Sequence, residues 1–328
     1  MRPGHVAILR IGSLRVEVDA SQERYLDDLA QIYSTELRPC DDELPVGLRL
    51  DIVDSPGPTP FVVPPDGLVI TADGTLRTEA IDAQTALEGD ASRAGDAWRA
   101  GEAPRARFTV HKTGLTDAER RIYLVVLLNK ILFWMGYVRQ HSSAVCLDGV
   151  ASMFVGDRGA GKSSTCAYIA GRGALVLADD DVMIHRNGKA FTVSGCDETM
   201  RIMADAERRL FGHLALPALD FGGIAKKQIA TADHFTTAPY VDYPLKQIFF
   251  PRVGEAFELD RLPPSRVAVR LLHSLAPSNR FAGTQDHLDT LGYVSELAAR
   301  VPAYALTLTR DYQGLDRLFE HLTDPSRP

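Results

Sequence analysis

A glycine-rich segment at residues 156–163, GDRGAGKS, fits the pattern G-x-x-x-x-G-K-[ST]. An apolar run at 150–155 precedes it and a helix-forming segment follows it, which is the context of a phosphate-binding P-loop. Backbone N–H groups of such a loop surround phosphate oxygens, Lys162 reaches the β- and γ-phosphates, and the Ser163 hydroxyl ligates Mg²⁺. The sequence therefore predicts ATP and Mg²⁺ binding through Gly156, Asp157, Arg158, Gly159, Ala160, Gly161, Lys162, Ser163 and Ser164.

Three consecutive carboxylates, Asp179, Asp180 and Asp181, follow the apolar run LVLA at 175–178. One helix separates this run from the P-loop, so we expect it to form the adjacent strand and to bring the carboxylates beside the phosphates. A bridging Mg²⁺ needs an oxygen ligand there and an attacking hydroxyl needs a base, so two neighbouring aspartates suit the two tasks. Asp181 is expected at the surface. The short spacing favours a compact kinase-like arrangement over a motor or a switch protein.

The segment 141–184 resembles a known family. HSSAVCLDGVASMFVGDRGAGKSS is similar to the histidine-bearing strand and P-loop of the HPr kinase/phosphorylase-like kinases, which are related to ATP-dependent phosphoenolpyruvate carboxykinase, and LADDDVMI is similar to their A-D-D-x-V-x-I segment. The resemblance implies that His141 lies near the acceptor, that Asp179 is the base and that Asp180 serves the metal. We do not find the family's C-terminal signature, so the resemblance implies a divergent member and not a true HPr kinase. From the residues alone, His141 can equally cap carbonyls or fill the edge of a core.

The elements expected around these residues alternate between strands and helices. A capping box, Thr116 with Glu119, opens a long apolar helix through about Tyr137 that Gly136 ends or bends. Further expectations are a hairpin at 5–18, a helix at 22–36, a hairpin at 183–193, helices near 198–213 and 264–275, a strand at 247–250, and a last strand and helix at 304–308 and 313–322. The predicted fold is α/β, an HPr kinase/PEP carboxykinase-like P-loop catalytic domain at 111–328 preceded by a smaller α+β domain at 1–110.

The expected reaction is transfer of the γ-phosphoryl group of ATP to a hydroxyl of a peptide, a protein or a small molecule, with Asp179, His141 and Lys162 as catalytic residues and Ser163 and Asp180 at the metal. Lys226, Lys227 or Arg252 could supply a further cation. Two alternatives stay open. A nucleotide hydrolase or nucleotide-gated module would position water instead of a hydroxyl, and a carboxykinase-like enzyme acting on a small carboxylic acid would need additional basic residues.

Length and composition limit the other function classes. A chain of 328 residues exceeds what one core usually serves, which favours two domains. A net charge of −7 gives no general attraction to nucleic acid or to an anionic membrane. The four cysteines lie far apart, and we find neither a signal peptide nor an apolar run of membrane-spanning length. We therefore expect a cytoplasmic protein without nucleic-acid or membrane partners, and the sequence leaves its oligomeric state, a homo-oligomer included, open.

Overall fold

The computed structural model describes residues 4–33, 46–55, 68–70, 75–79, 86–90, 105–111, 117–195, 199–203, 206–208, 218–220, 225–238, 240–275 and 284–324. The chain divides into two compact units, Met1–Val138 with Ala276–Thr290 and Arg139–Leu275 with Leu291–Pro328. The sequence prediction drew its boundary between residues 110 and 111. The two divisions differ at residues 111–138, which contain one long helix, and at residues 276–290.

The first unit contains a seven-stranded sheet in its described part, with the order β1-β2-β3-β7-β6-β5-β4. Its strands are β1 (His5–Ile11), β2 (Leu14–Ala20), β3 (Leu48–Ser55), β4 (Leu68–Ile70), β5 (Thr75–Glu79), β6 (Ala86–Asp90) and β7 (Arg105–His111). The predicted hairpin is confirmed: β1 and β2 pair antiparallel around Gly12, whose φ of 58° suits a glycine. Strand β3 then pairs parallel with both β2 and β7.

Two helices of the first unit contact each other, α1 (Glu23–Tyr33) and α3 (Asp117–Trp134). Arg121 Nε donates to Asp28 Oδ1 at 2.8 Å, and the Tyr33 hydroxyl donates to Asn129 Oδ1 at 2.9 Å. These contacts explain why α3 groups with the first unit, although the sequence prediction assigned it to the second. Helix α3 ends before Gly136, as predicted, where φ is 89°; Thr116 lies outside the described residues. No helix in the described part of the chain is long and apolar enough to span a membrane.

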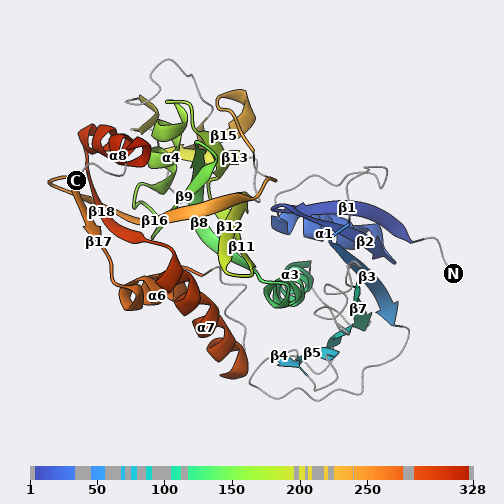
Figure 1. The fold of residues 1–328 in the computed structure, drawn as a ribbon. Coiled ribbons are helices and arrows are strands. Elements are labelled where there is room, and N and C mark those ends of the chain that lie inside the picture. The colour runs from blue at the N-terminus through green and yellow to red at the C-terminus, as the bar shows by residue number, and fades with distance from the viewer. Residues whose placement is uncertain are drawn as a thin grey trace. The chain divides into compact units, whose positions relative to one another are not determined.

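The second unit is built on an eight-stranded sheet with the order β10-β8-β11-β12-β16-β18-β17, in which β9 pairs with β8 and β16 (Figure 1). The strands are β8 (Tyr137–Leu147), β9 (Val150–Val155), β10 (Leu175–Ala178), β11 (Asp181–Asn187), β12 (Ala190–Gly195), β16 (Tyr243–Gly254), β17 (Glu258–Arg261) and β18 (Ala303–Thr309). Strand β16 pairs parallel with both β9 and β18, so the carboxyl ends of these three strands meet at one edge. The chain is thus a mixed α/β protein with a partly parallel second sheet.

Helices cover both faces of this sheet. They are α4 (Lys162–Ala170), α6 (Pro264–His273), α8 (Gln313–Thr323) and, from Leu291 onwards, α7 (Thr284–Arg300). Buried residues of α4 and α8 form one core cluster with Phe154, Phe249 and Leu306. Alternation along β16 turns Phe250 to the opposite face, where the Arg270 guanidinium of α6 lies 5.2 Å from its ring centre.

One expectation about strand order is wrong: β10 is not the neighbour of the P-loop strand β9. Strand β8 lies between them, because β8 and β9 form an antiparallel hairpin and β10 then pairs antiparallel with β8. The hairpin turns at Asp148 and Gly149, which both have positive φ. Two antiparallel steps make β10 run in the same direction as β9. The carboxylates after β10 therefore still emerge at the edge of the sheet where the P-loop begins.

The helix predicted near 198–213 is also wrong at its start, which forms strand β13 (Thr199–Met203). Strand β13 pairs with β15 (Ala225–Ala230), which also pairs with β14 (Ala218–Asp220). Residues 206–208 are helical, and most of the remainder of the predicted helix lies outside the described residues. Lys226 and Lys227 consequently belong to a strand and not to the basic loop that the sequence suggested.

Candidate functional site

The loop between β9 and α4 has the backbone that a P-loop pattern requires. Gly159 and Gly161 have φ values of 85° and 98°, a region that residues with a side chain rarely adopt. A Cβ on Gly156 would lie 3.3 Å from the Cβ of Ala160 and 3.5 Å from the carbonyl oxygen of Pro251. Backbone conformation therefore explains the glycines at 159 and 161, and close packing explains the glycine at 156.

Lys162 is the first residue of α4 and is only 6% exposed. Its ammonium donates to the carbonyl oxygens of Gly156 at 2.7 Å and Asp157 at 3.3 Å, so the side chain lies back along the loop. The helical hydrogen bonds begin with the Thr165 N–H, which donates to the Gly161 carbonyl. The N–H groups before Thr165 have no acceptor within the helix and point out of its first turn. These N–H groups and the charge of Lys162 make this end of α4 positive.

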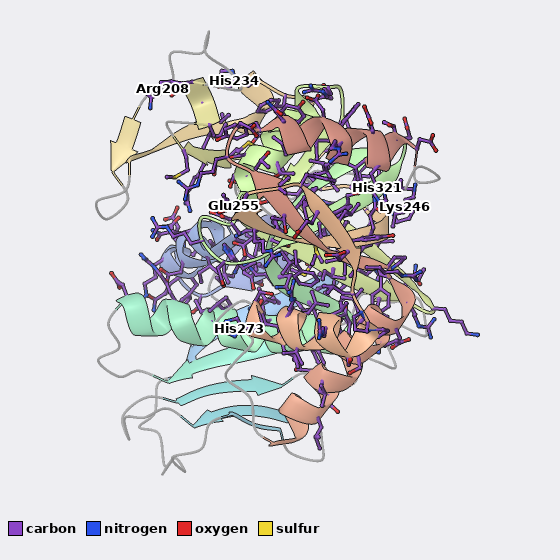
Figure 2. All side chains as sticks on the ribbon, turned by 90° about the vertical axis from the view of Figure 1, so that its left-hand side faces the viewer. Arg208, His234, Lys246, Glu255, His273 and His321 are labelled. Atoms are coloured by element: carbon purple, nitrogen blue, oxygen red, sulfur yellow. The ribbon has the colours of Figure 1, made fainter. Side chains whose placement is uncertain are left out.

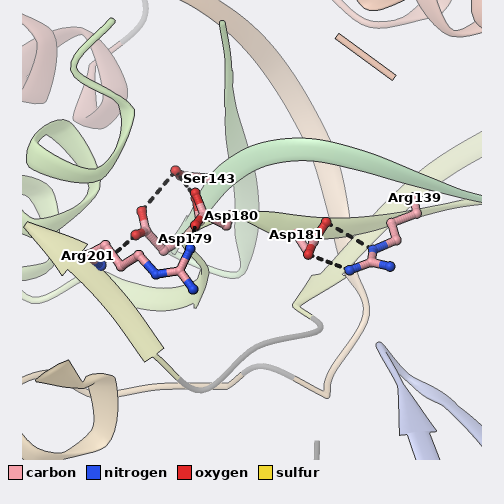
Figure 3. A network of polar contacts seen from close by, with 6 residues as sticks. All are labelled: Arg139, Ser143, Asp179, Asp180, Asp181 and Arg201. Carbon is pink, nitrogen blue, oxygen red and sulfur yellow. Dashed lines mark hydrogen bonds and ion pairs between the residues drawn. The ribbon is translucent and has the colours of Figure 1, made fainter. Parts of the chain in front are cut away.

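Asp179 is the centre of the polar contacts beside the P-loop, and it is 1% exposed (Figure 3). Its Oδ2 accepts the backbone N–H of Arg201 at 2.8 Å, and the Ser163 side chain is near enough to lower the pKa of its carboxyl group. The Ser143 hydroxyl donates to the Asp179 carbonyl oxygen and lies 3.1 Å from Oδ1. The structure thus brings two predicted site residues, Ser163 and Asp179, close to each other.

Burial, together with the neighbouring charge of Asp180, raises the pKa of Asp179 from 3.8 to about 6. The hydrogen bonds from Arg201, Ser163 and Ser143 partly offset this increase. A carboxyl group with a pKa near 6 is largely ionised at neutral pH and is still a better proton acceptor than an ordinary aspartate. The carboxyl group of Asp179 is thus able to accept a proton near neutral pH.

The raised pKa also predicts a pH-dependent stability. The folded protein binds the proton of Asp179 more tightly than the unfolded chain does, so stability falls as pH rises from about 4 to above 6. A pKa difference of about two corresponds to roughly 3 kcal/mol of unfolding free energy. We expect Asp179→Asn to gain about 2 kcal/mol of this relative to the wild type between pH 4.5 and pH 7.5, because the unfolded chain has already lost most of this proton at pH 4.5. Urea denaturation at both pH values measures the gain. A stability difference that does not change with pH would contradict this expectation.

The other two aspartates each pair with an arginine, in two separate groups (Figure 3). Arg201 Nη1 donates to Asp180 Oδ2 at 2.8 Å, beside the contacts of Asp179. Arg139 of β8 donates from Nε and Nη2 to the two carboxylate oxygens of Asp181, at 2.9 and 2.5 Å. Asp181 was expected at the surface. It is instead held in a two-point ion pair with an arginine that is 12% exposed.

His141 lies in β8, two residues from Arg139 and two from Ser143. Because side chains alternate along a strand, His141 shares a face with these two residues, which bind Asp181 and Asp179. The His141 side chain is half-buried, and within the described part of the chain it makes no side-chain hydrogen bond or ion pair. It therefore lies on the strand face that carries the carboxylate contacts, without being fixed to any of them.

Another histidine of the second unit, His321, has a packing role. His321 of α8 lies against two aromatic rings. Its ring centre is 5.4 Å from that of Tyr304 and 6.2 Å from that of Phe249. Burial and the nearby charge of Lys246, which lies beside it in Figure 2, lower the pKa of His321. A neutral imidazole packed between rings is a core residue.

Arg252 is not directed to the P-loop. It shares the face of β16 that carries Phe250, opposite to the face covered by α4. Its Nε donates to the Thr307 hydroxyl at 2.9 Å, and its Nη2 donates to Glu258 at 3.1 Å. The cation beside the carboxylates is Arg201, which the sequence reading did not select. The alternation in TMRIM could have revealed it, since Met200 and Ile202 are fully buried and Arg201 falls on the other face.

The donor set at this site suits a hard cation. One hydroxyl, Ser163, and two carboxylates, Asp179 and Asp180, are oxygen ligands of the kind that Mg²⁺ prefers. Within the described residues, no group of three or more histidine, cysteine, aspartate or glutamate side chains could hold a metal by itself. Mg²⁺ usually takes one or two carboxylates together with substrate phosphates and water, so these residues fit a metal that arrives with a nucleotide.

Comparison with known proteins adds little to this geometry. No protein-family model matches the chain, and no curated protein matches it. Among solved structures, the chain is similar to the Hpr(Ser) kinase/phosphatase from Coxiella burnetii, at 9% identity and a TM-score of 0.30, over 57% of this chain and 90% of that one. A likeness this distant does not determine chemistry, so function must be inferred from the residues of the site.

Proposed function

We propose that this protein is an ATP- and Mg²⁺-dependent kinase that transfers the γ-phosphoryl group to a hydroxyl, as a divergent member of the HPr kinase/phosphorylase-like group. The observation that supports this most is that the buried Asp179 lies close to Ser163, at the start of the P-loop helix, so that the serine side chain acts on the pKa of the aspartate. It joins a phosphate-binding loop to a carboxyl group whose pKa suits a proton acceptor.

The nucleotide phosphates would bind along residues 156–164. Phosphate oxygens would accept from the N–H groups of the first turn of α4, where the helix dipole also favours negative charge. The Lys162 ammonium, which now donates to two loop carbonyls, would exchange these acceptors for β- and γ-phosphate oxygens. Lysine keeps a charge-assisted hydrogen bond in both states, so the exchange leaves no buried ammonium unsatisfied.

The metal would be held by the Ser163 hydroxyl and the Asp180 carboxylate. When bound, Mg²⁺ would neutralise charge on the β- and γ-phosphates. Asp180 is more exposed than Asp179, with 28% of its side chain accessible, so it can reach a ligand that enters from solvent.

Asp179 would accept the proton of the acceptor hydroxyl. The acceptor oxygen then forms its bond to the γ-phosphorus, the bond from that phosphorus to the bridging oxygen of ADP breaks, and the hydroxyl proton stays on the Asp179 carboxylate. The contacts from Ser143 and the Arg201 N–H hold the carboxyl group in one orientation during this transfer. His141, on the same strand face as Ser143, would line the acceptor side.

The acceptor hydroxyl can belong to serine or threonine in a peptide or protein, or to a small alcohol. A carboxykinase-like reaction on a small carboxylic acid needs several cations around the acceptor, and Arg252 is engaged with Glu258 on another face of the sheet. A nucleotide hydrolase remains the alternative that the test must separate, because the same aspartate can orient water or an alcohol.

The test is incubation of the full chain with γ-labelled ATP, Mg²⁺ and a panel of hydroxylated peptides and metabolites. A kinase should release ADP slowly by itself and faster once the correct hydroxyl is added, with the label on the acceptor. His141→Ala should reduce the stimulated rate more than the basal rate. Fast basal ATP hydrolysis that releases stoichiometric phosphate and labels no acceptor would contradict the kinase function and support the hydrolase.

A further inference from the structure

Arg201 has a fixed backbone beside the proposed reaction centre. Its neighbours in β13, Met200 and Ile202, are fully buried in the core cluster that also contains Cys166 and Ala167 of the P-loop helix α4. Its own N–H donates to Asp179 Oδ2 at 2.8 Å. The strand is therefore anchored on both sides of Arg201, and its Cα is held close to the base whatever the side chain does.

The Arg201 side chain points the other way from its buried neighbours and reaches Asp180 (Figure 3). This ion pair is partly open to solvent, with 39% of the arginine and 28% of the aspartate side chain exposed. Exposed single pairs of this kind contribute little to stability, because solvent screens them and two side chains lose freedom. Arg201 can therefore leave Asp180 for another anion at a small cost in free energy.

We propose that Arg201 is a phosphate-contacting residue of this site: its guanidinium rests on Asp180 in the nucleotide-free protein and moves to the γ-phosphoryl oxygens when Mg²⁺ binds Asp180. This inference rests on the proposed function and adds to it a residue and an order of events. A divalent cation and a guanidinium compete for the same carboxylate, so metal binding displaces the arginine. The incoming γ-phosphate supplies the anion that receives it.

Arginine suits this position better than a second lysine would. Its planar guanidinium can bind two phosphate oxygens at once, whereas Lys162 acts as a point charge. Charge spreads over the equatorial oxygens of the transferring group, and a cation placed there stabilises it. Arg252, one of the cations that the sequence suggested, lies on the opposite face of the sheet. Arg201 is the arginine already in contact with Asp179, through its N–H, and with Asp180, through its guanidinium.

The test compares a non-hydrolysable ATP analogue with ADP by isothermal titration calorimetry, in the presence of Mg²⁺. Arg201→Ala should lower the affinity for the analogue by about tenfold to a hundredfold, because a charge-assisted hydrogen bond is lost. It should change the affinity for ADP by less than about twofold. Arg201→Lys keeps the charge and the backbone N–H, and should show a smaller loss in the same direction. Arg252→Ala, which removes an arginine from a similar exposed pair with Glu258, should change neither affinity.

A second readout follows the metal without turnover. Mn²⁺ binding to the ADP complex, followed by electron paramagnetic resonance, should require less metal in Arg201→Ala because the competing cation is gone. The proposal for Arg201 would be overturned if Arg201→Ala lost affinity equally for both nucleotides, kept its affinity for the analogue, or required more metal. If Arg201→Ala fails to fold by circular dichroism, Arg201→Lys decides between these outcomes. A wild-type protein that binds neither nucleotide overturns the proposed function itself, and with it this inference.

Discussion

Lys162→Ala should remove nearly all turnover and weaken ATP binding. The substitution deletes the ammonium that would offset the charge of the β- and γ-phosphates, which helix N–H groups alone cannot do. Loss of one such electrostatic contact typically lowers kcat by at least about a hundredfold, and loss of a charge-assisted hydrogen bond lowers affinity by about tenfold or more. Calorimetry with Mg·ATP and a coupled ADP assay measure the two effects.

The matched control for this variant is Lys189→Ala. Lys189 is an exposed lysine of the second unit that precedes β12, next to the turn at Gly188. It should keep both affinity and rate. Circular dichroism must show that Lys162→Ala is folded, because Lys162 is buried against the loop carbonyls. A folded Lys162→Ala with wild-type affinity and rate would refute the assignment of residues 156–163 as a P-loop.

Asp179→Asn should lower kcat by roughly a hundredfold to ten-thousandfold and leave ATP affinity almost unchanged. Asparagine can still accept the Arg201 N–H through its amide oxygen, so the local structure is retained, but it cannot take a proton from an acceptor. The same variant should be more stable than the wild type at pH 7.5, since the buried charge is gone. Loss of rate together with a gain in stability distinguishes a missing base from a damaged fold.

Asp180→Asn is the comparison for Asp179→Asn. It should raise the Mg²⁺ concentration needed for half-maximal rate and recover most of the wild-type kcat at saturating metal. The proximity of Ser163 to Asp179 makes this comparison informative, because it brings Asp179 as well as Asp180 close to the expected metal. If both variants change the metal requirement equally and neither lowers kcat at saturating Mg²⁺, the two aspartates do not divide the tasks as proposed.

The parts of the site that depend on nearby residues were predictable from the sequence. The glycines at 159 and 161 allow a backbone with positive φ, and the loop accordingly lies between a strand and a helix as the motif predicts. Gly136 ends α3 and Gly188 turns the hairpin of β11 and β12 for the same reason. A glycine needs no distant partner to permit these conformations, so the local sequence is sufficient to reveal them.

Strand order and the environment of each carboxylate were decided only by tertiary structure. The sequence placed β10 beside β9, but the β8–β9 hairpin occupies that position, and pairing between distant strands is not encoded in local periodicity. Burial gives Asp179 its raised pKa, and that burial depends on β8 and β13, which lie before and after it in the chain. Arg201 shows the same dependence: its alternating neighbours enter the core beside α4, and only this packing turns an ordinary surface arginine toward the carboxylates.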